Sequence, residues 1–323
     1  MTRAVFALSF GTLALLTLTV GAQDQSTYPS RAITVVVPFP AGGAADLLAR
    51  MAGEEVKASF GQAVVVENRP GASGITGTEF VSRAEPDGYT LVNAPMFNLS
   101  ISDLIARNSK FDPRTMEPIS VLAVYPTVLY ARANLPANTL PEMIAYAKAN
   151  PNKLSYASQG LGQIGHLTVE DLKRRADIEI LHVPYRGSAP AVTDLVSGQV
   201  DLLADSVAAG IEYVKAGKLK VLAVGSKERL KVFPDIAAFG ETLPGAFSET
   251  WMAVAAPPGT PKPIAAKISS AIARGFAKSE VKARVAQLQL DLFGSTPEQM
   301  AGIVQTTRER WQPVITAAKI VIE

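Results

Sequence analysis

The chain of 323 residues contains no cysteine and only two histidines. Without cysteine it has no disulfide bond, no thiol nucleophile, no thiolate metal ligand and no site for a lipid anchor on cysteine. The two histidines, His166 and His182, do not form a zinc-binding motif. The sequence also lacks G-x-S-x-G and G-x-x-x-x-G-K-[ST], so neither an α/β-hydrolase triad nor a P-loop nucleotide site is predicted.

Excess charge of either sign is also missing. The chain has 31 basic and 29 acidic residues, which gives a net charge of +2. Proteins that bind nucleic acid concentrate positive charge on one face, and so near-balanced a chain gives no such indication. We therefore expect no nucleic-acid partner.

Long apolar runs are confined to the N-terminus. Residues 1–22 read as a signal peptide, with Arg3 as a minimal basic region, an apolar segment from Phe6 to Val20, and small residues before Ala22. A retained membrane anchor is the alternative, but the apolar segment is short for a membrane span and contains serine and threonine. We expect cleavage, after which the mature chain of about 300 residues is long enough for two domains.

Strand and helix patterns alternate along the mature chain. The predicted strands are 33–37, 63–67, 89–94, 154–158, 178–183, 200–204, 219–224 and 249–256. The predicted helices are 47–60, 75–84, 140–149, 165–175, 189–197, 211–216, 263–277, 281–289 and 297–318. This alternation predicts an α/β fold with mainly parallel sheets, in two domains that separate near residues 125–134.

A Pro/Gly-rich loop follows the first strand. The segment ITVVVPFPAGGAADLLAR (33–50) combines a β-branched run, a loop and a helix start. Backbone N–H groups at the start of a helix have no intrahelical acceptor, so this loop is a candidate anion site. Structurally, Asp46 is suited to be the N-cap or a first-turn acid of this helix, and functionally it could orient the loop or receive a ligand ammonium. We favour the cap.

A second glycine loop, SQGLGQIG (158–165), lies between a strand and a helix. Its glycines at 160, 162 and 165 match G-x-G-x-x-G, the fingerprint of dinucleotide binding, and Arg186 could then meet a 2′-phosphate of NADP. The other two interpretations are a plain turn and a small-anion site built from the same N–H groups. We favour the anion site.

Four single residues could each have a structural or a ligand-binding role. His166 follows the second loop, so it is either a ligand neighbour or a structural hydrogen-bonding residue, and His182 is expected to be structural. Asp205 ends a strand and is either a cleft residue or a solvated strand end. Trp251 is expected in the core rather than in a pocket wall.

Several segments together resemble the Bug family, the extracytoplasmic solute receptors of tripartite tricarboxylate transporters. They are YPSRAITVVVPFPAGGAAD (28–46), VVVENRPGASGITG (64–77), EPDGYTLV (85–92), SQGLGQIGHL (158–167), HVPYRGSAPAVTDLVSGQVDLL (182–203) and AGKLKVLAV (216–224). Leu161 and Gln163 stand where the resembled family often has a Gly-Ser or Ser-Gly pair. Leu161 and Phe97 predict a more apolar pocket than one for citrate.

The resemblance implies a type II periplasmic-binding-protein fold with two α/β lobes that close on a small carboxylate. It implies lobe 1 at 28–124 plus 222–323, lobe 2 at 125–221, a periplasmic location, membrane permease subunits as partners, and a monomer without cofactor, metal or catalytic residue. A ligand sensor for a membrane kinase is the alternative. The expected ligand-binding residues are Phe39, Pro40, Ala41, Gly42, Gly43, Asp46, Asn93, Ala94, Ser158, Gln159, Gly160, Leu161, Gly162, His166, Tyr185, Arg186, Gly187 and Asp205.

Overall fold

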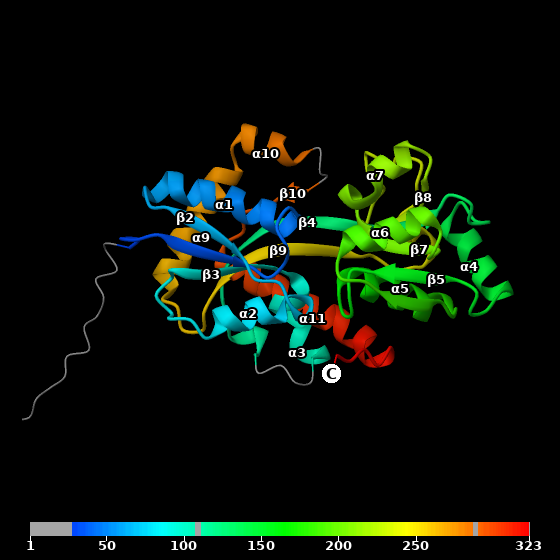
Figure 1. Cartoon of the computed structure of the whole chain (residues 1–323), viewed down its shortest axis with the longest axis horizontal. Coiled ribbons are helices and arrows are strands. Elements are labelled where there is room, and N and C mark those ends of the chain that lie inside the picture. The colour runs from blue at the N-terminus through cyan, green and yellow to red at the C-terminus, as the bar shows by residue number, and fades with distance from the viewer. Residues whose placement is uncertain (1–27, 107–110, 287–289, 323) are drawn as a thin grey trace, which may run out of the picture.

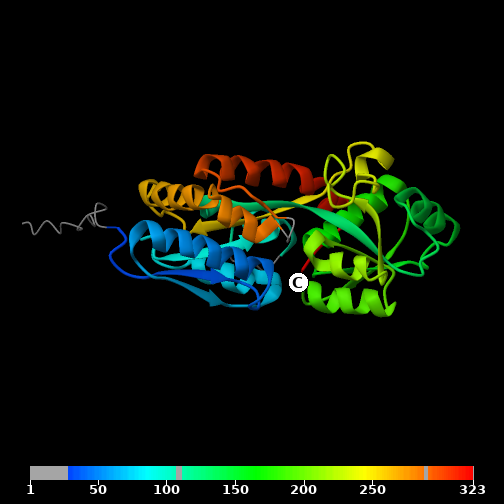
Figure 2. The same cartoon turned by 90° about the horizontal axis from the view of Figure 1, so that it is seen from above.

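A computed structural model describes residues 28–106, 111–286 and 290–322. The predicted signal peptide lies outside these residues, as do the last three residues of the predicted helix 281–289. Within the described ranges no helix has the length and apolar character needed to cross a membrane. Figures 1 and 2 show two bodies side by side along the long axis of the molecule, connected by long strands.

The first body is built on sheet 1. Its parallel strands are β2 (Val64–Asn68), β1 (Ile33–Val37) and β3 (Thr90–Pro95), and its antiparallel strands are β9 (Glu249–Ala256), the first part of β4 (Glu117–Arg132) and β10 (Asp291–Leu292). Helices α1 (Ala44–Phe60), α9 (Lys262–Phe276) and α10 (Ser279–Ala286) share one buried apolar cluster. Helices α2 (Ile75–Ser82), α3 (Ser102–Ile105) and α11 (Pro297–Ala317) share the other, with the short helical segment η3 (Phe97–Ile101). We call this body lobe 1.

The second body, lobe 2, is built on sheet 2. Its strands are the last part of β4 with β7 (Leu202–Ser206), β8 (Leu219–Val224), β5 (Ser155–Ser158) and β6 (Leu181–Pro184), of which β5, β6 and β7 are parallel. Helices α4 (Leu140–Ala149), α5 (Ile164–Ala176) and α8 (Phe239–Thr242) contribute to one apolar cluster, and α6 (Ser188–Ser197) and α7 (Val207–Lys215) to the other. The α/β prediction is confirmed.

Strand β4 links the two sheets. Its first ten residues pair with β9 in lobe 1, and the residues from Thr127 onward pair with β7 and β8 in lobe 2. At the crossing, Thr127 N–H donates to the Ser248 carbonyl at 2.9 Å, and Gly225 N–H donates to the Thr127 carbonyl at 2.7 Å. A Cβ at Gly225 would lie 2.4 Å from that Ser248 oxygen. Only glycine therefore allows these three segments of the backbone to approach so closely.

The sequence pattern did not predict this strand, because Pro118 and Pro126 lie within it and proline cannot donate to a strand ladder. The position expected to separate the domains is therefore a continuous strand. Residues 222–248, expected in lobe 1, pack on sheet 2: Leu222 and Phe239 belong to one of its buried clusters and Val224 to the other. We accordingly propose that the chain returns to lobe 1 at Ser248, later than the residue-222 boundary that the resemblance implied.

Most other elements agree with the sequence prediction. Helix α4 and strands β8 and β9 have the predicted bounds, whereas β6 begins at Leu181 instead of residue 178 and α7 begins at Val207 instead of residue 211. Thr139 and Thr296 cap α4 and α11 through their side-chain oxygens. The segments η2 (Ala72–Gly74), η3 and η4 (Pro113–Thr115) and the helix α3 were not predicted.

Candidate ligand-binding cleft

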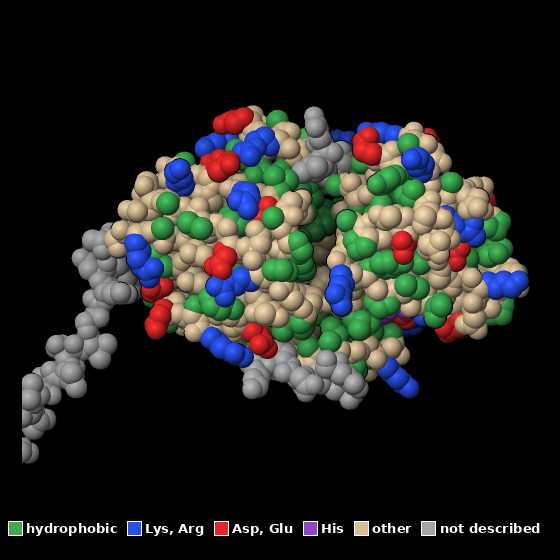
Figure 3. All heavy atoms as spheres, in the orientation of Figure 1, with side chains coloured by type: hydrophobic (Ala, Val, Ile, Leu, Met, Phe, Trp, Pro, Cys, Tyr) green, Lys and Arg blue, Asp and Glu red, His purple; other side chains and the backbone are tan. Residues whose placement is uncertain are grey.

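The carboxyl ends of the parallel strands of both lobes lead into loops that approach one another. In lobe 1 these loops follow β1, β2 and β3, and in lobe 2 they follow β5, β6 and β7. Ligands of open α/β sheets bind at this edge. Figure 3 shows a hollow between the two lobes, which Figure 1 places between the N-terminal end of α1 and helices α6 and α7. We call this hollow the cleft.

The loop after β1 is held by the carboxylate of Asp46. Its Oδ2 accepts the Gly42 N–H at 3.1 Å and Arg50 Nε at 3.0 Å, and its Oδ1 accepts Arg50 Nη2 at 2.9 Å and Asn68 Nδ2 at 3.1 Å. Asn68 Nδ2 also donates to the Phe39 carbonyl at 3.0 Å. A carboxylate has about four acceptor positions, and all four of Asp46 are occupied within the protein.

Of the two structural roles expected for Asp46, that of N-cap is wrong, because the N-cap of α1 is Gly43 and no side chain caps the helix there. The other is confirmed: Asp46 is an acid in the first turn of α1, and it orients the preceding loop. The ion pair with Arg50 is the main cause that holds the pKa of Asp46 below its usual range, and the hydrogen bonds from Gly42 and Asn68 add to it. The Asp46 carboxylate is thus ionised, Arg50 balances its charge, and its oxygens face the loop.

The loop after β5 satisfies many of its own N–H groups. Gly160 N–H donates to Ser158 Oγ at 3.3 Å, Gly162 N–H to His166 Nδ1 at 3.1 Å, and Gly165 N–H to Gln159 Oε1 at 3.2 Å. The three glycines of the G-x-G-x-x-G pattern therefore offer no free N–H group. In the described part of the chain, the Leu161 N–H has no hydrogen-bond acceptor.

The two histidines form a buried stack behind this loop. The ring centroids of His166 and His182 are 4.0 Å apart with planes 9° apart, and Tyr156 stacks on His182 at 4.7 Å. His182 Nε2 is 2.7 Å from Ser158 Oγ. Burial is the main cause that lowers the pKa of His166 to about 3 and of His182 to about 4. His166 thus supports the loop from inside as a neutral hydrogen-bond acceptor.

Lobe 1 contacts the loop after β5 directly. Gln163 Nε2 donates to the Ser73 carbonyl at 3.2 Å, and Asn98 Nδ2 donates to the same oxygen at 3.1 Å. A Cβ at Gly162 would lie 2.7 Å from Phe97 Cε2 and 2.9 Å from Ile105 Cδ1. Gly162 is therefore the point where lobe 2 fits against the η3–α3 segment of lobe 1.

The back of the lobe boundary is also tied together. Thr168 Oγ1 of α5 is 2.5 Å from Ser248 Oγ, and Arg310 of α11 donates to the Phe247 carbonyl while its guanidinium lies 3.6 Å from the Phe247 ring centre. In Figure 2 helix α11 runs along lobe 1 towards the segment that precedes β9. These contacts leave the strand-end loops as the open side.

The remaining predicted residues have different surroundings. The Tyr185 hydroxyl donates to Asp194 Oδ2 at 2.7 Å, and Gly187 N–H donates to the Gln159 carbonyl at 3.1 Å, whereas Arg186 is exposed. Asn93 is fully buried and donates to the Ala45 carbonyl at 2.7 Å, and Ala94 lies in the second apolar cluster of lobe 1. Trp251 is a core residue, as expected, with its indole N–H on Thr307 Oγ1.

Asp205 is buried, with only 6% of its surface exposed, so the interpretation as a solvated strand end is wrong. Its Oδ1 accepts the Ser206 N–H at 2.7 Å. Burial raises its pKa, and the facing Ser188 and Gln159 side chains act in the opposite direction. Asp205 therefore lies below the N-terminus of α6, next to the loop after β5.

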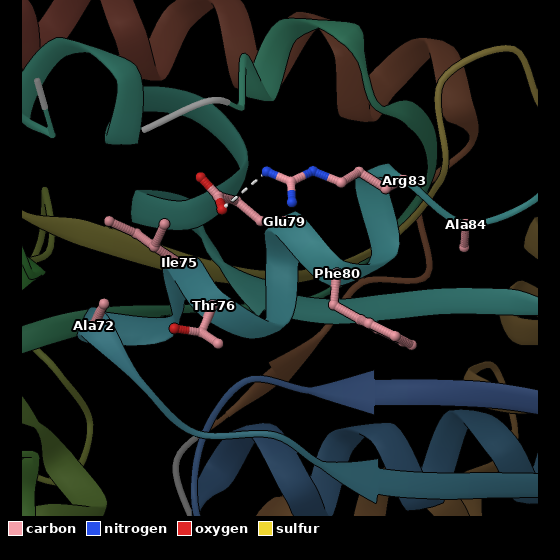
Figure 4. Close-up of a pocket in the computed structure, with 7 residues that line it drawn as sticks. All are labelled: Ala72, Ile75, Thr76, Glu79, Phe80, Arg83 and Ala84. Atoms are coloured by element: carbon pink, nitrogen blue, oxygen red, sulfur yellow. Dashed lines mark hydrogen bonds and ion pairs between the residues drawn. The ribbon is translucent and has the colours of Figure 1, made fainter. Parts of the chain in front are cut away.

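A separate groove of about 550 Å³ runs along the outside of α2. Figure 4 shows its lining residues, which are Ala72, Ile75, Thr76, Glu79, Phe80, Arg83 and Ala84. The Arg83 guanidinium is 3.4 Å from the Glu79 carboxylate. The groove lies outside the cleft, and no strand-end loop of lobe 2 lines it.

Sequence reasoning missed several cleft residues. Ser73 accepts a hydrogen bond from Gln163 of lobe 2, Asn98 donates to the same Ser73 carbonyl from within lobe 1, and Asn68 holds the loop after β1. The segment 64–77 was recognised as part of a family pattern, but its turn was not placed at the cleft. Its position directly after a parallel strand was the signal that could have done so. Among the described residues no cluster of acidic residues or histidines could hold a metal ion.

This chain is similar to a family of known proteins in its sequence and to solved structures in its fold. The family described as "Tripartite tricarboxylate transporter family receptor" matches residues 48–320. The UPF0065 protein of the tcbD-tcbE intergenic region of Pseudomonas sp. strain P51 is 37% identical over 310 residues, which are 95% of this chain and 92% of that protein.

Two solved structures are similar along nearly their whole length. R. palustris Rpa4515 with adipate has a TM-score of 0.84 and 32% identity, and covers 91% of this chain and 99% of its own. MatC (Rpa3494) from Rhodopseudomonas palustris with bound malate has a TM-score of 0.81 and 31% identity, and covers 89% and 100%. The predicted periplasmic-binding-protein fold is thereby confirmed. The chain belongs to the receptor family of the tripartite tricarboxylate transporters, a family of binding proteins and not of enzymes.

Proposed function

We propose that this protein captures a small carboxylate between its two lobes and delivers it to the permease of a tripartite transporter. The observation that carries the proposal is the pair of facing strand-end loops, each of which leads into a helix N-terminus. An anion is stabilised there by unpaired N–H groups and by the helix dipole. The two relatives with adipate and malate support a carboxylate as that anion.

The donors assigned to the ligand differ between the two loops. In lobe 1 they are the N–H groups of Gly43 and Ala44 at the start of α1, since Gly42 is committed to Asp46. In lobe 2 they are the N–H groups of Leu161 and of Ile164 at the start of α5, since the three glycines of that loop are occupied. Each helix end contributes roughly 0.3–1 kcal/mol when exposed, and more when partly buried. The exposed Arg186 is the cation we assign to this site.

Closure of the lobes would then enclose the carboxylate. We assign the hinge to the crossing at Thr127, Gly225 and Ser248, where backbone hydrogen bonds join three segments of the chain. The bond from Gln163 to Ser73 belongs to the closed side of this motion. A ligand favours closure only to the extent that it binds the closed arrangement more tightly.

We further propose that the protein acts as a monomer in the periplasm after removal of residues 1–22. A sensor for a membrane kinase would bind its ligand in the same way and differ only in its partner. The NADP interpretation loses its main support, because Gly160, Gly162 and Gly165 donate their N–H groups within the protein and leave no cradle for a pyrophosphate.

The test is thermal unfolding against a panel of mono-, di- and tricarboxylates, with the corresponding neutral amides as controls. A ligand present at 100 times its dissociation constant stabilises the folded state by about 2.7 kcal/mol. For this chain length we expect a rise in midpoint of several degrees with at least one carboxylate and none with its amide. No shift with any carboxylate would contradict the proposal, and a shift with NADPH would favour the oxidoreductase.

A further inference from the structure

Unsatisfied acceptors collect at the strand ends that border the cleft. The described residues contain four buried side-chain polar atoms without a hydrogen-bond partner, and three of them are oxygens: Asn93 Oδ1, Asn98 Oδ1 and Asp205 Oδ2. Buried polar atoms in native proteins are nearly always paired, so each such oxygen points to a missing donor. Asp205 Oδ2 differs from the two amide oxygens because it belongs to an ionisable group.

Within the described residues, no group around Asp205 donates a hydrogen bond of normal geometry to Oδ2. Gln159 faces the carboxyl, but its Nε2 donates to the Ala204 carbonyl at 2.9 Å and its Oε1 accepts Gly165 N–H at 3.2 Å. The Ser188 hydroxyl faces the carboxyl but completes no hydrogen bond with Oδ2. The Ser206 N–H is taken by the other oxygen, Oδ1.

Tyr125 lies on the neighbouring strand β4, between the lobes. It packs in the first cluster of lobe 1 with Phe39 and is 9% exposed. Strand β4 pairs with β7 so that Val128 lies opposite Asp205, which places Tyr125 a short way along the strand from that position. Burial is the main cause that raises the pKa of Tyr125, and the charge of Asp205 adds to it.

We infer that Asp205 Oδ2 accepts a hydrogen bond from a hydroxyl or ammonium group carried by the ligand next to a carboxylate. The inference rests on the proposed function and deepens it, because it names the ligand class as 2-hydroxy or 2-amino carboxylates. A second carboxylate directly on Asp205 would be repelled, whereas the neighbouring helix N-termini suit a carboxylate one carbon away. The family does not decide the matter, since malate carries a 2-hydroxyl and adipate carries none.

The experiment uses the mature protein and dicarboxylic acids of three carbon-chain lengths. Affinities are measured by titration calorimetry for succinate, malate and aspartate, then for glutarate, 2-hydroxyglutarate and glutamate, and then for adipate, 2-hydroxyadipate and 2-aminoadipate, each chiral acid as both enantiomers. For the chain length that binds, we expect one donor-bearing acid to bind at least about tenfold more tightly than its parent, the ratio expected of one buried hydrogen bond. The hydroxy and amino members show which donor it is.

The variant Asp205→Asn sharpens the test. Ser206 N–H keeps the amide oxygen of the new residue, so an NH₂ group replaces Oδ2 and faces the ligand donor. The preference over the parent acid should disappear, and the matching 2-oxo acid, such as 2-oxoglutarate, should gain affinity relative to wild type. Asp291→Asn, an exposed change on β10, is the control and should leave all ratios unchanged.

The outcomes separate the inference from the proposed function. Tight binding of a parent acid by the wild type with no gain from a hydroxyl or ammonium group would overturn the inference and leave carboxylate capture intact. An equal loss of all acids in a folded Asp205→Asn variant would also overturn it. Absence of binding by every acid would overturn the proposed function itself. If the variant does not fold, the wild-type ratios alone decide.

Discussion

The backbone N–H of Gly162 donates a hydrogen bond of 3.1 Å to Nδ1 of His166. The bond fixes the loop after β5, and it requires an unprotonated Nδ1. His182 and Tyr156 stack around the His166 imidazole, and Lys173 of α5 is the charge that acts on it. Glu170, which accepts a hydrogen bond from Tyr156 at 2.7 Å, acts on His182. The geometry of the binding loop thus depends on a neutral histidine.

This relationship predicts that the folded state loses stability in mild acid. Both histidines have folded-state pKa values below their ordinary 6.5, at about 3 and about 4, so the unfolded chain binds the extra protons. Stability is therefore complete above pH 6.5 and declines as the pH falls from there towards 4. Between pH 7 and pH 5 we expect a loss of roughly 2 kcal/mol from His166 and less from the more exposed His182, measured by urea unfolding.

The control for this prediction is His166→Asn, which keeps an acceptor for Gly162 and cannot titrate. It should show less than half of the wild-type pH dependence, because only the smaller contribution of His182 remains. The chain has only two histidines, so few other groups titrate in this range, and Asp205, whose pKa is raised by burial, acts in the opposite sense. An unchanged pH dependence in the variant would show that His166 is not the cause.

A second prediction concerns Asp46→Asn. The amide offers one oxygen and one NH₂ group to four donors, so at least one donor of the loop is left facing another donor. We expect a loss of about 1–2 kcal/mol in unfolding free energy and weaker carboxylate binding. Glu54→Gln on the same helix is the control, because Glu54 and Arg284 form a pair whose side chains are 58% and 50% exposed. The control should cost under about 0.5 kcal/mol.

A third prediction tests the loop after β1 through Gly42→Val. Gly42 has φ +90° and open space around it, as does Gly61 at the other end of α1 with φ +73°. Valine at either position costs roughly 1–2 kcal/mol of backbone strain, but only Gly42→Val should abolish carboxylate binding in calorimetry. Wild-type affinity in a folded Gly42→Val variant would refute the role of this loop.

A fourth prediction tests the fit between the lobes. Alanine at Gly162 would bring a Cβ within 2.7 Å of Phe97, whereas alanine at Gly217 meets no atom within 4 Å at a similar positive φ of +68°. Gly162→Ala should therefore bind carboxylates at least about tenfold more weakly, while Gly217→Ala binds as wild type and shows the same strain of roughly 1–2 kcal/mol. Equal affinities in the two variants would place the closing contact elsewhere.

The fold follows from the sequence where local signals are strong. Helix α4 has its predicted bounds because Thr139 supplies the cap at its start. Strand β4 was missed because its prolines argue against a strand locally, and only pairing with β9, far away in the sequence, fixes it as one.

The cleft was predicted at the level of loops and not of atoms. The glycine pattern 160–165 locates the second loop, but the sequence does not show that Gln159 and His166 take its N–H groups, since that depends on side-chain rotamers. Ser73 was not predicted because its contact with Gln163 arises from the packing of two lobes, and Asn98 was not predicted because it donates to the same Ser73 carbonyl from a distant part of the chain. For the same reason Asp205 could be interpreted as either buried or solvated.

Amide hydrogen exchange with and without a bound carboxylate shows whether the ligand contacts the loops of both lobes. The carboxylate that gives the largest thermal shift is added at saturation, and exchange is followed by mass spectrometry in peptides spanning 38–48 and 158–167. Capture between the two loops predicts slower exchange in both peptides and no change along the outer face of α2. Stabilisation by the ligand with protection of only one loop, or of the groove beside α2 alone, would contradict capture between the two loops.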